Sequence, residues 1–514
     1  MARVVSWCAA LVLIGAAGAS ASARPVTNPE PNAPVSATAD EQMTKVKQAL
    51  ALVQNHDIKG AKSLLAPVVN GPDFYDLAPQ VRFAVLGLFA LAQIEDRDAA
   101  ALTTAKRLTA MEDFADGDSW NLRLLADGVA SDDADAVASL SVIAKRWPDA
   151  LSNTDDETVR GLVFRTADVG ALADARFDML AALHQAGWKP ADPINEPDYV
   201  WFEFARLLLM KGRVEEARAV ARPITDHDMV EQMQMQKLFD PITQDGDPRF
   251  DSQQVVDRYI QILRDKVKAN PNRLEVVNNL ALMLTEVGKA DEALRMLDAA
   301  LARSKQGATA PGAFTDTDQI NWTYNQRAYT LLALGRIDEA LRQMATGAGK
   351  PENGGDNVSQ QLNLAQMYET VGRPMEAMKV IAGADHWILS AYGRSDYEGV
   401  KACASAELGD RAEVAKSIAY LAAHEADART WLIDALVCAN DLDGAAKYVI
   451  RELDDPVERI DVLGWFKQEP SPATVPPILK QRDDRITQLY QRPDVRAAID
   501  KVGRRISVPY YSWE

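Results

Sequence analysis

Residues 274–303 read LEVVNNLALMLTEVGKADEALRMLDAALAR, and this stretch decides the fold. Apolar residues recur in it at helical spacing, first from Val277 to Leu284 and again from Ala293 to Ala300. This spacing buries one face of each of two helices. Gly288 interrupts the pattern, and glycine readily adopts the left-handed conformation that ends a helix. The stretch therefore predicts two helices joined by a tight turn.

A pair of short helices buries too little surface to be stable alone, so it needs similar neighbours on both sides. The same pattern recurs along the chain about every 40 residues, which is the spacing of helical-repeat proteins. Its clearest copies turn at Gly212, Gly335 and Gly372. Fainter copies turn at 55–57, 95–96, 131–132, 170, 409 and 440–441. No alternating β-branched run of useful length appears, so the chain is predicted to be all-α.

The pattern resembles the tetratricopeptide repeat (TPR), a family of helical pairs. The family's consensus has six characteristic positions: a large residue, a leucine, a small residue, an aromatic or leucine, a glycine and an alanine. In this chain the corresponding residues are, in the same order, Val277, Leu280, Ala281, Leu284, Gly288 and Ala293. The resemblance implies a right-handed superhelical α-solenoid of TPR-like hairpins. It also implies a scaffold that binds proteins and is not an enzyme.

The N-terminus predicts export. Residues 1–23 carry Arg3, an apolar core and the small residues Ala21-Ser22-Ala23, as a cleaved signal peptide does. A retained membrane anchor is the alternative, but the apolar run is shorter than the roughly 20 residues that a span needs. We therefore expect a periplasmic protein, or a secreted one as the alternative, with no transmembrane segment after cleavage.

The remaining chain divides into four predicted regions. Residues 24–39 form a proline-rich disordered linker, 40–228 degenerate TPR-like repeats, 229–454 TPR-containing repeats, and 455–514 a C-terminal capping region. In the last region a helix is expected at about 495–502. The tail SVPYYSWE either packs on this cap or offers an aromatic contact, and packing is favoured.

Composition and motifs exclude several function classes. The formal charge of −18 makes nucleic acid an unfavourable partner. Phosphate-binding, dinucleotide-binding, nucleophile-elbow and metalloprotease motifs are missing, so no cofactor, metal or catalytic residue is predicted. Asp226-His227-Asp228, Asp116-Gly117-Asp118 and Asp245-Gly246-Asp247 could be parts of cation sites, but helix caps and turns explain them better.

Two cysteines remain after signal cleavage, Cys403 and Cys438. They are about one helical pair apart, so a bridge between neighbouring pairs is possible in an oxidising compartment. Two separately buried thiols are favoured, because free cysteine commonly acts as a small apolar residue.

The TPR resemblance also implies a binding face, since the first helix of each pair lines the concave side of these scaffolds. The candidate groove residues at the inward-facing places are Asn278, Leu282, Trp322, Asn325, Tyr329 and Gln366. Such a groove suits an extended segment or helix of a protein partner, with aromatic anchors. Alternatively, Trp322 and Tyr329 pack against the insertion loop at 305–318. The lysines that bind chaperone tails in one branch of the family are replaced by Asn278, Asn325 and Leu362, which disfavours such a partner.

The sequence thus favours an exported TPR scaffold that mediates protein–protein interaction in the bacterial cell envelope, in a process such as envelope assembly or polysaccharide export. A glycan-binding solenoid is the alternative, because scattered tryptophans could stack on sugars. A helical-scaffold enzyme acting on envelope polymers is disfavoured, because no clustered His/Tyr/Arg site is apparent.

Overall fold

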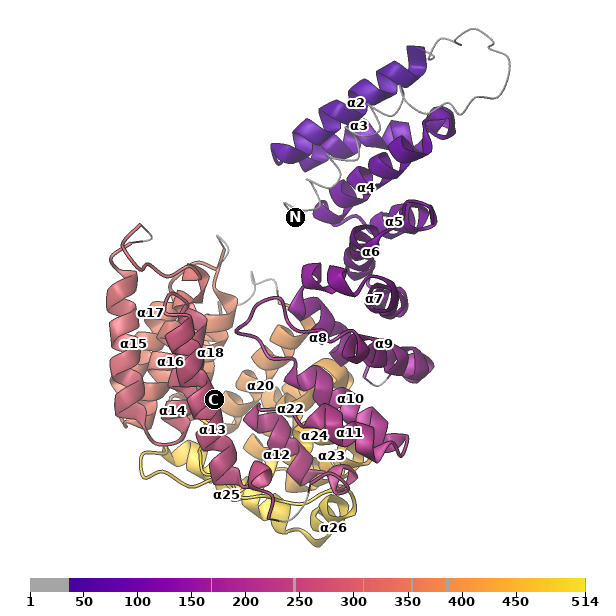
Figure 1. Ribbon diagram of the computed structural model, residues 1–514. Coiled ribbons are helices and arrows are strands. Elements are labelled where there is room, and N and C mark those ends of the chain that lie inside the picture. The colour runs from indigo at the N-terminus through magenta and orange to yellow at the C-terminus, as the bar shows by residue number, and fades with distance from the viewer. Residues whose placement is uncertain are drawn as a thin grey trace, which may run out of the picture. The chain divides into compact units, whose positions relative to one another are not determined.

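The computed structural model describes residues 37–167, 169–243, 246–307, 309–352, 355–383 and 389–513 (Figure 1). The described residues form helices and turns with no β-strand, which confirms the all-α prediction. The chain divides into two compact units, Met1–Leu207 and Leu208–Glu514. None of the described helices is both long enough and apolar enough to cross a membrane. The predicted signal peptide lies outside the described residues.

Unit 1 is a stack of helical pairs. Its helices are α2 (Ala37–Gln54), α3 (Ile58–Asn70), α4 (Pro79–Glu95), α5 (Ala101–Thr109), α6 (Gly117–Ala130), α7 (Asp133–Arg146), α8 (Asp156–Arg165), α9 (Ala173–Gln185) and most of α10 (Asp198–Met210). Each helix from α2 to α7 packs on the next, and α9 packs on α7. Helix α2 overlaps the end of the predicted linker, whose other residues lie outside the described ones. The division between the units falls within α10, ahead of the predicted boundary at 228.

Unit 2 holds the best-formed pairs. Its helices are α11 (Val214–Ala221), α12 (His227–Met235), α13 (Ser252–Ala269), α14 (Leu274–Glu286), α15 (Ala290–Ser304), α16 (Ile320–Ala333), α17 (Ile337–Ala348), α18 (Val358–Thr370), α19 (Pro374–Ile381), α20 (Ala391–Leu408), α21 (Arg411–Ala423), α22 (Glu425–Cys438), α23 (Leu442–Asp454), α24 (Arg459–Trp465), α25 (Pro477–Gln491) and α26 (Pro493–Val502). The first helices of the pairs also contact one another, from α14 to α16, α18 to α20 and α20 to α22. We call α14, α16, α18, α20 and α22 the inner row.

Left-handed residues mark the turns between paired helices. Gly288 has φ +76° after α14, as the sequence predicts, and an L side chain rarely adopts this conformation. The same place is held by Gly212, Gly335, Gly372, Gly409, His56, Arg97, Ser131 and Asn440. In several pairs the next residue is an aspartate that caps the second helix. These caps are Asp57, Asp132, Asp410 and Asp441.

A fully buried charge cluster lies in unit 1. Glu203 accepts hydrogen bonds from Arg176 at 2.7 Å and from Arg206 at 2.8 and 3.0 Å, and all three side chains are at most 2% exposed. Burial opposes ionisation of Glu203, but the two guanidinium groups outweigh it and lower the pKa of Glu203. The cluster therefore keeps its charges inside the helical stack.

The two ends of unit 2 contact each other. The C-terminal helices, yellow in Figure 1, return to the start of the unit, where Gln232 of α12 donates to the carbonyl of Ile460 at 2.8 Å. The Lys467 amine pairs with Glu231 at 2.8 Å, and the Tyr510 hydroxyl donates to Glu231 at 2.7 Å. We call Glu231, Lys467 and Tyr510 the clasp.

Helix α25 is absent from the sequence-based prediction, which expects only an interrupted capping region with one helix near its end. The prolines around 470–477 suggest breaks, yet Pro477 stands at the first helical position of α25, where proline is tolerated. The predicted last helix is confirmed as α26. The tail packs, as favoured: Tyr510, Tyr511 and Trp513 are each 4% exposed.

Candidate functional site

The six candidate groove residues lie on three neighbouring helices of the inner row. Asn278 and Leu282 belong to α14, Trp322, Asn325 and Tyr329 to α16, and Gln366 to α18. Their exposure differs strongly: Asn278, Asn325 and Tyr329 are buried, Leu282 and Gln366 are partly buried, and Trp322 is 38% exposed. The structure therefore places the residues in one row but leaves only part of that row open.

The buried amides connect inner-row helices to one another. Asn278 donates from Nδ2 to the carbonyl of Gln319 at 3.4 Å, and Asn363 of α18 donates to Oδ1 of Asn325 at 2.9 Å. The hydroxyls of Thr285 and Thr330 lie 2.8 Å apart. Buried polar groups of this kind are costly unless they are hydrogen-bonded. The amides and hydroxyls thus fix the spacing of the helices.

Tyr329 packs against the tail. Its ring belongs to an apolar cluster that contains Leu332, Tyr511 and Trp513. The insertion loop packs elsewhere, through Phe314 in a cluster with α14 and α15. The sequence suggested that Tyr329 either anchors a partner or contacts the insertion loop. Neither alternative included the tail in the surroundings of Tyr329.

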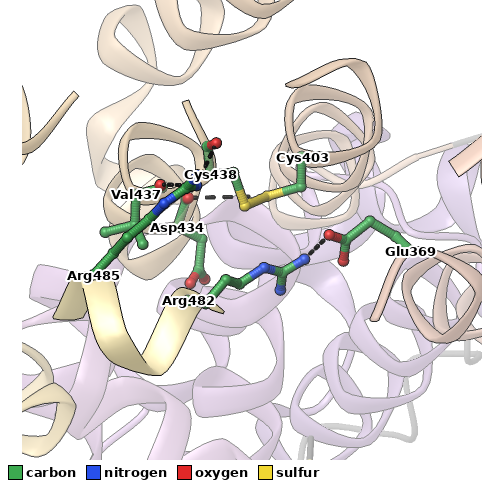
Figure 2. Close-up of a disulfide and its surroundings, with 7 residues drawn as sticks. All are labelled: Glu369, Cys403, Asp434, Val437, Cys438, Arg482 and Arg485. Atoms are coloured by element: carbon green, nitrogen blue, oxygen red, sulfur yellow. Dashed lines mark hydrogen bonds and ion pairs between the residues drawn. A yellow bond between two sulfur atoms is a disulfide. The ribbon is translucent and has the colours of Figure 1, made fainter. Parts of the chain in front are cut away.

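Helix α25 lies against α18 and α22 of the inner row. Arg482 forms an ion pair with Glu369 of α18 (Figure 2). Arg485 donates to the carbonyls of Val437 and Cys438, both at 2.9 Å, and so occupies two carbonyls at the C-terminal end of α22. A cation at this place satisfies carbonyls that the helix itself cannot. Arg482 and Arg485 therefore attach α25 to the inner row.

Cys403 and Cys438 form a disulfide, so the favoured expectation of two separate thiols is wrong. The bond joins α20 to the last residue of α22, with the two Cα atoms 5.1 Å apart, and Figure 2 shows it beside the Glu369–Arg482 pair. The spacing of one helical pair brings Cys403, in the C-terminal half of α20, beside Cys438 at the end of the neighbouring inner-row helix α22. Their side chains thus meet on the face that α25 covers.

Two inner-row carboxyls, Asp434 and Asp396, have their pKa raised by burial, with no opposing cation among the described residues. Burial raises the pKa of Asp434 on α22 to about 7 and that of Asp396 on α20 to about 7 as well. Both influence the exposed Tyr392, whose pKa is raised first by burial of its hydroxyl and then by Asp396. These acids are therefore partly protonated near neutral pH.

Asp434→Asn is expected to change how stability depends on pH. A carboxyl whose pKa is raised on folding stabilises the fold fully below its unfolded pKa of about 4, and this contribution is lost as pH rises towards 7. Asparagine cannot ionise. Between pH 5 and pH 8 the free energy of unfolding of the variant should therefore exceed that of the native protein by roughly 1–2 kcal/mol. Urea unfolding at several pH values measures this difference. Asp427→Asn, an exposed change on the same helix, should show no such gain, and equal pH profiles for Asp434→Asn and the native protein would contradict the assignment.

The possible cation clusters are explained by caps and pairs. Asp226 caps α12 by accepting from Met229 at 3.0 Å, the His227 ring stacks on Tyr259 at 4.6 Å, and Asp228 pairs with Lys467 at 2.9 Å. Cys403 and Cys438 lie beside Glu369, but their sulfurs are bonded to each other.

The two acidic turns serve the helices that follow them. Asp116 forms a capping box with Ser119 at the start of α6. Asp247 caps the short 3-10 helix Pro248–Phe250, whereas Asp245 lies outside the described residues.

One aromatic cluster joins residues that are distant in the sequence. His227, Tyr259 and Tyr510 meet, with Tyr510 also 2.9 Å from the Lys467 amine. Because these residues are far apart in the sequence, spacing could not reveal the cluster. The clasp groups are buried and paired with one another, so the cluster holds the ends of unit 2 together.

Comparison with known proteins places the best-formed pair in a family. Residues 273–306 match the family model described as tetratricopeptide repeat, and this segment coincides with α14, α15 and their turn. No curated protein matches the chain. Among 32 matching solved chains is that of the "Crystal Structure of Rap Protein Complexed with Competence and Sporulation Factor". It is 14% identical, with 88% of this chain and 99% of that chain covered and a TM-score of 0.31. The chain is thus an all-α array of helical pairs in which residues 273–306 match a tetratricopeptide repeat.

Proposed function

We propose that this chain is an exported scaffold that binds an extended segment of a protein partner on the inner row of unit 2, in the bacterial cell envelope. The observation that carries the proposal is that the inner row already holds an extended segment, the chain's own tail. Main-chain hydrogen bonds and aromatic contacts are the means by which helical scaffolds and sheet edges hold such segments. Envelope assembly and polysaccharide export are the processes in which such a scaffold would act.

Two features support the location outside the cytoplasm. The first 23 residues have the composition of a signal peptide, and a disulfide joins the only two cysteines that cleavage would leave. Disulfides persist in the periplasm and outside the cell, and are rare in the cytosol. Cell fractionation tests this part of the proposal: recovery of the uncleaved chain in the cytosol, with both thiols free to alkylation, would contradict it.

Trp322→Ala is expected to weaken partner binding at least about tenfold, because exposed tryptophans at the centre of a binding face commonly act as anchors. The measurement is recovery of partners from the envelope fraction by the tagged native chain and by the variant, followed by titration of the recovered protein. Met375→Ala is the matched control, since Met375 is a 54% exposed apolar residue on α19, outside the inner row. Equal recovery by both variants would remove the inner row from the proposal.

A further inference from the structure

The tail, residues 507–513, contains no helix and joins apolar clusters of α14 and α16. Its main chain is held from both sides: Tyr511 donates to the carbonyl of Glu286 on α14 at 3.1 Å, and Val508 donates to the carbonyl of Gln468 at 3.0 Å. Ser512 donates from its main chain to the Glu469 carboxylate at 3.1 Å. Main-chain bonds of this kind do not depend on the sequence of the bound segment. They would hold any segment that follows the same path.

The side chains of the tail supply the selectivity. Val508 and Tyr510 join the apolar cluster of α13 and α14, while Tyr511 and Trp513 join that of α16. The hydroxyls find acceptors as well, since Tyr510 donates to Glu231 and Tyr511 donates to Asp483 at 3.1 Å. The site therefore fits two consecutive tyrosines, a β-branched residue two places before them and a tryptophan two places after.

Three carboxylates and one amine contact the tail. Glu231, Glu469 and Asp483 accept hydrogen bonds from it, and the Lys467 amine donates to the Tyr510 hydroxyl at 2.9 Å. Carboxylates suit tyrosine hydroxyls and main-chain amides as donors, but they repel negative charge. The carboxylates therefore favour hydroxyl and amide donors at these places, and the Lys467 amine supplies one positive charge beside the first tyrosine.

We propose that the tail is a ligand held in cis, and that the partner segment of the scaffold has the same chemistry and takes the tail's place. This inference rests on the proposed function and names the class of partner: an extended, uncharged segment with paired tyrosines followed by a tryptophan. Release of the tail alone exposes three aromatic rings, so it occurs only when another segment replaces them. The bound tail thus keeps the inner row closed to segments that lack this pattern.

The test uses the full chain with a protease site inserted after Arg505, so that residues 506–514 stay bound after cleavage. A fluorescent peptide of sequence ISVPYYSWE is then added, and fluorescence anisotropy follows its binding. The cleaved protein should bind the peptide at least about tenfold more tightly than the uncleaved protein, because the local concentration of the covalent tail is lost. Native mass spectrometry should show one tail or one peptide per chain.

Controls separate this site from any other. The peptide with both tyrosines and the tryptophan changed to alanine should bind at least about tenfold more weakly, and the Tyr329→Ala chain should show the same loss for the native peptide. Equal binding by cleaved and uncleaved protein, or a cleaved tail that never exchanges with excess peptide, would overturn the inference. A chain that exchanges the peptide but recovers no reproducible partner from the envelope fraction would refute the proposed function alone. A chain that recovers partners but never exchanges its tail for the peptide would refute only the cis-ligand inference.

Discussion

Replacing Glu203 by alanine is expected to lower the free energy of unfolding by about 3–5 kcal/mol, because removal of one partner leaves buried charges uncompensated. Arg176 and Arg206 both bond to this carboxylate, and all three side chains are at most 2% exposed. Without Glu203 the guanidinium groups would face each other across a cavity. Urea unfolding followed by circular dichroism should show an early transition of unit 1.

The matched control for this change is Glu216→Ala. Glu216 pairs with Arg213 at the same i, i+3 spacing and with the same two-pronged geometry as Glu203 with Arg206, but the Glu216 side chain is 57% exposed. Exposed pairs contribute little to stability because water and salt screen them, so this change should cost far less than Glu203→Ala. If the two variants lose the same stability, burial of the Glu203 cluster is not what makes it important.

Changing Cys403 and Cys438 together to serine is expected to cost about 3–4 kcal/mol of the free energy of unfolding. The bond closes a segment of 35 residues, and the chain-entropy model assigns a loop of this size roughly that stabilisation. The serines also leave hydroxyls on a face that α25 covers. Thermal unfolding of the native protein with and without a dithiol reductant measures the same effect without substitution.

Three samples provide the control for the disulfide. The reduced native protein, the single variant Cys403→Ser and the double variant should unfold at similar temperatures, all below the oxidised native protein. An oxidised native protein that unfolds with the reduced one would show that the bond contributes nothing to unit 2.

The repeat architecture could be predicted from the sequence because its determinants are local. Gly288 and its equivalents mark each turn, and the apolar residues between them have the period of a helix. The exposure of the groove could not be predicted, because Tyr329 lies in a buried apolar cluster with Tyr511 and Trp513, which are far along the chain. The repeat pattern predicts which helix face a residue occupies. It does not predict which other segment of the chain packs on that face.

Helix α25 and the disulfide escaped prediction for different physical reasons. The prolines before α25 resemble breaks, and Arg482 and Arg485 look like surface charges although they bond to the inner row. The spacing of Cys403 and Cys438 is compatible with a bridge, but only the crossing of α20 and α22 brings their Cα atoms close enough. Both features depend on contacts between helices that are not adjacent in the sequence.

The clasp changes how unit 2 gains and loses its structure. In an open row of repeats each pair contacts only its neighbours, so end pairs open independently and amide hydrogens there exchange early. In unit 2 the Tyr510–Glu231 bond joins residues 279 positions apart. Helix α12 and the C-terminal tail therefore protect each other, and we expect the slowest amides at the two ends of unit 2 to exchange together in one cooperative opening. Closing such a long loop also slows folding, because the chain loses conformational entropy before the contact forms.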